Sequence, residues 1–168
     1  MKWAVPLLFL AAAAAAVETA AFSAGSPAGW SVEKTSSTAT YLRPPEKDAA
    51  AATIVLAYDA PSEGRPADAA AYVARSLAPD SLFGLPSDFA RGKDMDVAGR
   101  PSAVLTRRVA STSRHADRQE MAETVVVVPA AKGYYVLTLH GPASRSARDG
   151  SAFRALLKTF KPAGAAKR

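Results

Sequence analysis

Two apolar runs joined by a short turn lie at residues 119–140, which read QEMAETVVVVPAAKGYYVLTLH. Both runs are rich in β-branched and aromatic residues, and Pro129 to Lys132 separates them, so they predict a β-hairpin. Alternate residues of a strand point to opposite sides. In the second run, Tyr135, Leu137 and Leu139 share one side, and the other side carries Tyr134, Val136, Thr138 and His140. An antiparallel sheet is therefore expected at the centre of the fold.

Two amphipathic helices are predicted around this sheet. The first covers Ala67 to Ala78, with Pro66 before it and Asp68 near its positive end. Its apolar positions are Ala70, Tyr72, Val73 and Leu77. The second runs from about Arg148 to Phe160 and stops before Pro162. Its apolar stripe follows i, i+3, i+4 and i+7, at Phe153, Leu156, Leu157 and Phe160.

Three further segments have strand patterns. Trp30–Val32 and Thr38–Leu42 predict an opening hairpin, and Thr53–Tyr58 is a continuous apolar run typical of a buried central strand. Asp94–Ala98 and Ser102–Ala110 flank a predicted turn at Gly99-Arg100-Pro101. This order of elements predicts an α+β fold with an antiparallel sheet of about six to seven strands and two helices that bury their stripes against it.

Composition limits the possible chemistry. The chain has 168 residues, 21 Lys plus Arg against 15 Asp plus Glu, two histidines and no cysteine. That length fits one domain. The absence of cysteine excludes disulfides, thiolate metal ligands and a thiol nucleophile, and two histidines exclude a multi-histidine metal site. The sequence contains no Gly-x-Ser-x-Gly, HExxH or P-loop motif, so no enzymatic activity is expected.

The N-terminus has the pattern of an export signal. Lys2 precedes an apolar run from Ala4 to Val17, and small residues allow cleavage after Ala21 or Ser23. The alternative, a retained membrane anchor, is disfavoured because such a run spans about 21 Å as a helix, against roughly 30 Å of hydrocarbon. We therefore expect a periplasmic or secreted protein. Its expected parts are a signal peptide at 1–21, a linker at 22–29, one domain at 30–162 and a basic tail at 163–168.

Several motifs resemble those of the PsbP/DcrB-like family. They are the aromatic-led opening at Gly29-Trp30 with the strand Thr53–Tyr58, the turn within Val97–Ala103, and the ending Gly133–Leu139 followed by Phe153–Leu157 and Thr159-Phe160. The resemblance covers most of the chain from Gly29 to Pro162. It implies an α/β/α sandwich around a twisted antiparallel sheet, and an accessory, partner-binding or chaperone-like role without a shared catalytic residue. Exported relatives often carry a lipid-anchoring cysteine, which this chain lacks.

Three groups of polar residues could bind a metal or catalyse a reaction. His115-Ala116-Asp117, with Glu120, could bind a divalent metal, but Arg114 and Arg118 would repel the cation, so a solvated loop is favoured. Asp94 and Asp96 share one side of a strand and could bind calcium, although a solvated strand face is favoured. His140 is interpreted as a structural residue at a strand end rather than as a general base. No metal or cofactor is therefore expected.

Basic residues provide the favoured functional feature. Arg154, Lys158 and Lys161 form a basic stripe at i, i+4 and i+7 of the second helix, and Arg107, Arg114 and Arg118 flank a hairpin. These residues are candidates for binding a protein partner or an anionic envelope component, with ordinary solubilising charge as the alternative. Nucleic acid is disfavoured because no aromatic residues interleave the basic ones.

Large apolar residues also occur in a segment rich in proline and glycine. They are Leu82, Phe83, Leu85 and Phe89, which either cover the core or form a lid over a ligand groove. The sequence therefore predicts an exported, non-enzymatic domain that docks a protein partner or an envelope component. The alternative is an accessory domain that binds a small ligand or metal in a pocket under residues 82–89.

Overall fold

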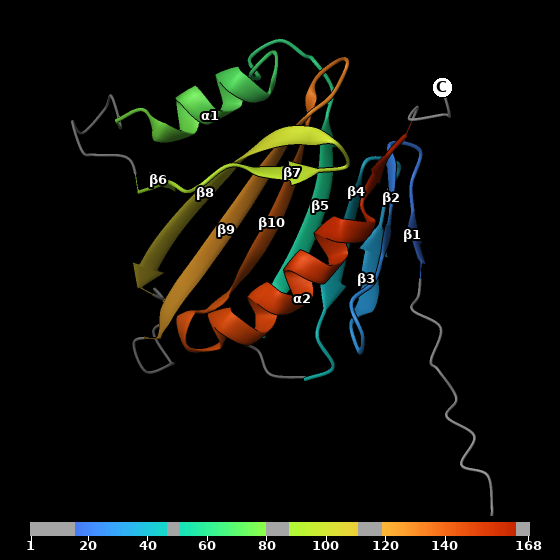
Figure 1. Cartoon of the computed structure of the whole chain (residues 1–168), viewed down its shortest axis with the longest axis vertical. Coiled ribbons are helices and arrows are strands. Elements are labelled where there is room, and N and C mark those ends of the chain that lie inside the picture. Colours follow the sequence, from blue (N-terminus) through green and yellow to red (C-terminus); the bar gives the residue numbers. More distant parts are fainter. Residues whose placement is uncertain (1–15, 47–50, 80–87, 111–118, 164–168) are drawn as a thin grey trace, which may run out of the picture.

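The hairpin predicted at 119–140 forms the centre of the main sheet. It consists of β9 (Glu120–Pro129) and β10 (Tyr134–Pro142), which pair antiparallel from Tyr134 opposite Pro129 to Pro142 opposite Met121. The computed structural model describes residues 16–46, 51–79, 88–110 and 119–163. Within them the main sheet has eight strands, in the order β3-β4-β5-β10-β9-β8-β6, with β7 paired to β8 (Figure 1).

The remaining strands of this sheet are β3 (Ser31–Thr35), β4 (Ala39–Arg43), β5 (Thr53–Asp59), β6 (Ala90–Arg91), β7 (Met95–Val97) and β8 (Arg100–Ala110). All their pairings are antiparallel. This confirms the α+β class and the three predicted hairpins. The sheet is larger than the predicted six to seven strands because Ala90–Arg91, too short to give a sequence pattern, forms a further edge pairing with β8.

The two helices cover opposite faces of the central strands. Along β9, Val126 and Val128 belong to the core beneath α2 (Ser146–Thr159), whereas Val125 and Val127 pack in a second cluster with Val73 of α1 (Ala69–Leu77). A run of four valines is needed because both faces of this strand are buried. In Figure 1, α2 crosses the front of the sheet.

The predicted stripe of α2 is confirmed. Phe153, Leu156, Leu157 and Phe160 are all buried against the sheet. A one-turn 3-10 helix (Ala143–Arg145) leads into α2. In α1, Asp68 caps the first turn by accepting a hydrogen bond from the Ala71 amide at 2.8 Å. Ala70 is predicted to point inward but is exposed, because only a narrow stripe of α1 around Val73 packs against the sheet.

The segment predicted as a linker, residues 22–29, is part of the folded domain. Its first residues form β2 (Phe22–Gly25), which pairs with β1 (Ala16–Glu18) and with β11 (Lys161–Pro162) in a separate three-stranded sheet. Phe22 is 1% exposed, and its ring lies 5.7 Å from that of Phe160, between centroids. Small residues predict a linker from the sequence, but in the structure they allow β2 to approach the end of α2 closely. The Gly25 amide donates to Thr159 Oγ1 at 2.9 Å.

The β7–β8 turn is one residue earlier than predicted. Ala98 and Gly99 occupy its centre with φ of 55° and 72°, as in the two-residue type I′ turns that join twisted strands. Arg100 and Pro101 therefore belong to β8 rather than to the turn. The hairpin folds toward the side of the sheet that α2 covers, because Val97 belongs to the α2-side core.

Candidate functional site

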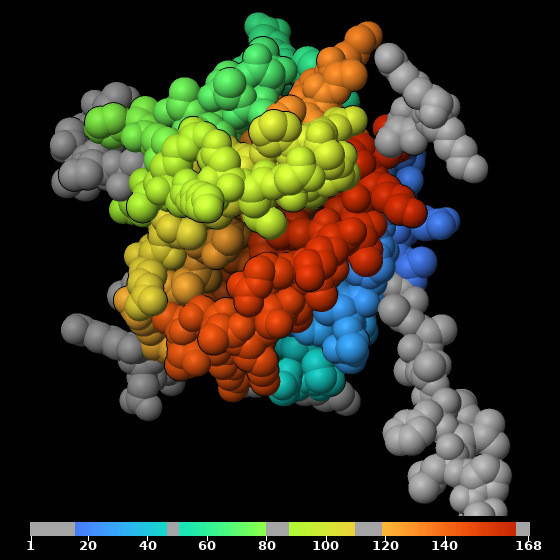
Figure 2. Space-filling view, viewed as in Figure 1, coloured from blue at the N-terminus to red at the C-terminus, as the bar shows by residue number. Residues whose placement is uncertain are grey.

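A cavity of about 300 Å³ lies between α2, the start of the β7 hairpin and the main sheet. In Figure 2 this hollow opens between the yellow-green hairpin and the orange-red helix, with β8 and β9 behind it. Its floor is Val104 of β8, Ala122, Thr124 and Val126 of β9, and Leu139 and Gly141 of β10. Its walls are Lys93, Met95, Pro142, Ser146, Asp149, Gly150, Phe153, Arg154 and Leu157. Most of the lining is therefore apolar.

Asp149 is the exceptional residue in this wall. Its side chain is in the first turn of α2, where a carboxylate interacts favourably with the helix dipole, and the residue is only 3% exposed. Oδ1 accepts a hydrogen bond from Arg148 Nε at 2.9 Å, whereas Oδ2 is buried without a hydrogen-bond partner among the described residues. Buried polar atoms are nearly always paired, so this unpaired carboxylate oxygen is unusual, although its burial keeps it out of contact with molecules in the cavity.

Arg148 compensates the charge of Asp149. The hydrogen bond from its guanidinium to Asp149 raises the pKa of Arg148, and a second bond joins Arg148 to Glu46 at 2.6 Å. Two more cations, Lys93 and Arg154, line the same cavity with exposed side chains. The site thus combines an apolar interior, the hydroxyl groups of Thr124 and Ser146, and a positively charged border. Such a combination is suited to binding a small amphipathic molecule.

The outer surface of α2 carries the basic stripe predicted from the sequence. Arg154, Lys158 and Lys161 are all exposed, and we call these three residues the basic face. No ion pair in the described part of the chain involves any of them. Lys158 and Lys161 also line a shallow depression together with Glu18 of β1.

The structure separates Arg107 from the basic face. Residues of β8 alternate between the two sides of the sheet, so Arg107 shares the side of Leu105, which packs in the cluster near α1. Its Nε donates to Glu123, and its guanidinium lies 4.5 Å from the centre of the Phe89 ring. Arg107 therefore has local partners and lies on the other side of the sheet. Arg114 and Arg118 lie outside the described residues.

Of the predicted lid, only Phe89 lies within the described residues. Leu82, Phe83 and Leu85 lie outside the described residues, whereas Phe89 is half-buried and packs in the cluster near α1. The cavity that contains Asp149 is on the opposite side of the sheet.

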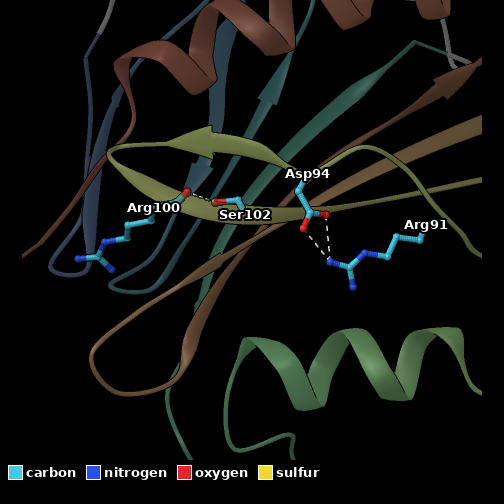
Figure 3. A network of polar contacts seen from close by, with 4 residues as sticks. All are labelled: Arg91, Asp94, Arg100 and Ser102. Atoms are coloured by element: carbon cyan, nitrogen blue, oxygen red, sulfur yellow. Dashed lines mark hydrogen bonds and ion pairs between the residues drawn. The ribbon is translucent and has the colours of Figure 1, made fainter.

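Among the described residues, the other polar candidates do not gather as metal ligands. Asp94 binds Arg91 through both carboxylate oxygens, at 3.0 and 2.9 Å (Figure 3). Asp96 accepts from the Gly99 amide at 2.9 Å. His140 is exposed on β10, and His115 with Asp117 lies outside the described residues. Within the four described ranges, no three His, Asp or Glu side chains gather as metal ligands.

Neither the cavity nor the buried position of Asp149 is predicted from the sequence. A signal was present, because the stripe of α2 extended back by four residues from Phe153 arrives at Asp149, a charged residue at an inward position. The volume left between helix and sheet could not be predicted, since it depends on how the β7 hairpin and α2 approach each other. Among the described helices, none has the length and hydrophobicity needed to cross a bilayer.

Neither a family model nor a curated protein matches this sequence, but solved structures share its fold. LpqN, described as involved in cell envelope biogenesis of Mycobacterium tuberculosis, aligns with a TM-score of 0.53 and 17% identity, over 91% of this chain and 87% of LpqN. The Ran-binding protein Mog1p of Saccharomyces cerevisiae aligns with a TM-score of 0.51 and 10% identity, over 88% and 94% of the two chains.

A structure from Bacteroides thetaiotaomicron aligns with a TM-score of 0.54 and 10% identity, over 88% of this chain. This chain spans about half of that one, 47%. The likeness shows a Mog1/PsbP-like fold. This confirms the α+β fold expected from the PsbP/DcrB-like resemblance, whereas membership of that family is not shown. At identities this low, the comparisons show the fold and assign no role to any residue.

Proposed function

We propose that this chain is a non-enzymatic binding domain that acts outside the cytoplasm and docks an acidic partner protein. The docking surface is the basic face, which comprises Arg154 and Lys158 on α2 and Lys161 on β11. Export is proposed from the N-terminal sequence pattern, and the absence of enzymatic activity from the lack of a catalytic motif in the sequence.

The observation that carries this proposal is that no residue of the basic face forms an ion pair with the described residues. Elsewhere, several described arginines pair with acids. These pairs are Arg43–Glu33, Arg65–Asp59, Arg91–Asp94, Arg108–Glu120 and Arg148–Glu46. Lysines and arginines without such partners can contact an acidic surface without first breaking an internal ion pair. Opposite potentials on two proteins accelerate their encounter and fix their orientation.

The roles of two proteins of the same fold agree with a binding function. Mog1p is described as Ran-binding, and LpqN as involved in cell envelope biogenesis. Both cases are consistent with a fold that presents surfaces to partners. The acidic character of the partner proposed for this chain follows from its own basic face and not from either protein.

The test is a capture experiment with a charge-reversed variant. The chain from Ala16 onward is immobilised, exposed to envelope extract at low ionic strength, and eluted with a salt step. Exposed charges interact over about 10 Å at 0.1 M salt and much less at 1 M, so a charge-driven partner should leave in the salt step. The Arg154→Glu/Lys158→Glu variant should fail to retain that protein.

A matched control has the same change in net charge at a different place. Lys34→Glu/Lys132→Glu alters two exposed lysines away from α2 and should retain the partner as the unaltered chain does. Equal loss in both variants would mean that net charge, rather than the basic face, controls binding. A salt eluate without protein, or with only an anionic polymer, would refute the acidic protein partner.

A further inference from the structure

The cavity beneath α2 has an apolar floor and two cations at its border. We infer that it binds an anionic amphiphile, an unbranched hydrocarbon chain that ends in a carboxylate. The chain lies on the floor, and the carboxylate contacts Lys93 and Arg154. This inference goes beyond the docking function, because it concerns a small ligand on the inner side of α2 rather than a protein on its outer surface.

The floor of the cavity favours a hydrocarbon chain. Val104, Val126 and Leu139 come from three adjacent strands, and Phe153 and Leu157 face them from α2. Transfer of apolar surface from water to such a lining is favourable, and each buried methylene group raises affinity roughly fourfold. The volume of about 300 Å³ is at the lower end of small-molecule sites. A short chain therefore fits better than a long one.

The cations at the border favour a negatively charged head group. Lys93 precedes β7 and Arg154 lies on α2, so they belong to the two elements between which the cavity opens (Figure 2). Both residues are exposed, and neither forms an ion pair with another described residue. Arg154 extends over the cavity wall, because its Nη1 lies 3.5 Å from the position that a Cβ on Gly150 would occupy. A carboxylate can therefore contact these cations without displacing an internal partner.

The acidic residue in the wall does not cancel this preference. Among the described lining residues only Asp149 is acidic, and it is buried and bonded to Arg148. A ligand ammonium would be repelled by Lys93 and Arg154 and would find no accessible carboxylate in the lining. A hydroxyl head group would gain no charge–charge attraction. Of three ligands with the same chain, the carboxylate should therefore bind most tightly.

The experiment measures binding of octanoate, octanol, octylamine and butanoate to the full chain by calorimetry at low ionic strength. Octanoate should bind about fivefold more tightly than octanol and about tenfold more tightly than octylamine, as expected for two exposed ion pairs. Butanoate has the same head group on a shorter chain and should bind roughly a hundredfold more weakly than octanoate. If octanoate binds no more tightly than any one of the other three probes, the proposal is overturned.

Charge removal tests the contact with the carboxylate. Lys93→Gln/Arg154→Gln alters two exposed residues at the border and should weaken octanoate binding about fivefold, with octanol binding unchanged. The matched control, Lys158→Gln/Lys161→Gln, removes two charges of the basic face that do not line the cavity. It should leave octanoate binding unchanged. An equal effect of the two double variants would overturn the assignment of the head group.

Filling the floor tests the position of the chain. Ala122→Leu occupies part of the cavity and should abolish binding of octanoate and octanol, whereas Ala155→Leu, on the exposed side of α2, should not alter it. Unchanged binding in a folded Ala122→Leu variant, or equal loss in both leucine variants, would overturn the site. If Ala122→Leu does not fold, the charge variants decide. The docking function fails separately, because Lys158→Gln/Lys161→Gln should weaken capture of the acidic partner without affecting octanoate.

Discussion

Deletion of residues 1–21 should destabilise the domain far more than deletion of residues 1–15. The longer deletion removes β1, including Val17, which is 2% exposed. Burial of a valine side chain is worth about 1.5–3 kcal/mol. It also removes the Ala21 carbonyl, which accepts from Tyr135 Oη at 3.1 Å and from the Ala163 amide at 2.7 Å. Leaving the buried Tyr135 hydroxyl without an acceptor costs about 1–3 kcal/mol.

Some of this loss is recovered as neighbouring residues relax, so the expected difference is about 3 kcal/mol in the free energy of unfolding. For a chain of this size it corresponds to a lowering of Tm by roughly 6–12 °C, measured by circular dichroism. Within the longer protein, Val17→Ala should cost about 1–2 kcal/mol. The adjacent exposed Glu18→Ala should change stability by less than about 0.5 kcal/mol. Equal Tm values for the two deletions would show that β1 is not part of the stable domain.

The same contacts bear on where the proposed export signal is cleaved. Cleavage at either site expected from the sequence would remove β1. Cleavage after Ala21 would place the new ammonium group on the buried Phe22, and cleavage after Ser23 would remove Phe22 as well and place the group within β2. A charged terminus beside an apolar core is unfavourable. If the protein is exported as proposed, we therefore expect intact mass measurement to find an N-terminus at or before the exposed Ala16. A mature protein beginning at Phe22 would contradict this.

Three further predictions concern the stability of the fold. Gly133→Ala should prevent stable folding or cost several kcal/mol in chemical denaturation, because φ is 70° and a Cβ there would lie 2.0 Å from the Asp59 carbonyl oxygen. Ala98→Asn should raise stability by about 0.5–1 kcal/mol in the same assay, since asparagine tolerates the left-handed conformation better than alanine does. Burial raises the pKa of three tyrosine hydroxyls in the folded state above the ordinary value of 10.0, at Tyr72, Tyr134 and Tyr135. Their contribution to stability is fully present below pH 10.0 and decreases as pH rises above it, so tyrosinate absorbance should appear together with unfolding in an alkaline titration. Full tyrosinate absorbance in a chain that remains folded would refute that prediction.

The sheet and helices were predictable because their patterns are local. Two patterns indicate which side of their element is buried, and the structure confirms both. They are the alternation through Tyr134 to Leu139 and the stripe from Phe153 to Phe160. The small sheet was not predictable, because Phe22–Gly25 has no such periodicity. Its pairing with Lys161–Pro162 joins segments from opposite ends of the domain, and the contact that stabilises it is visible only after the chain has folded.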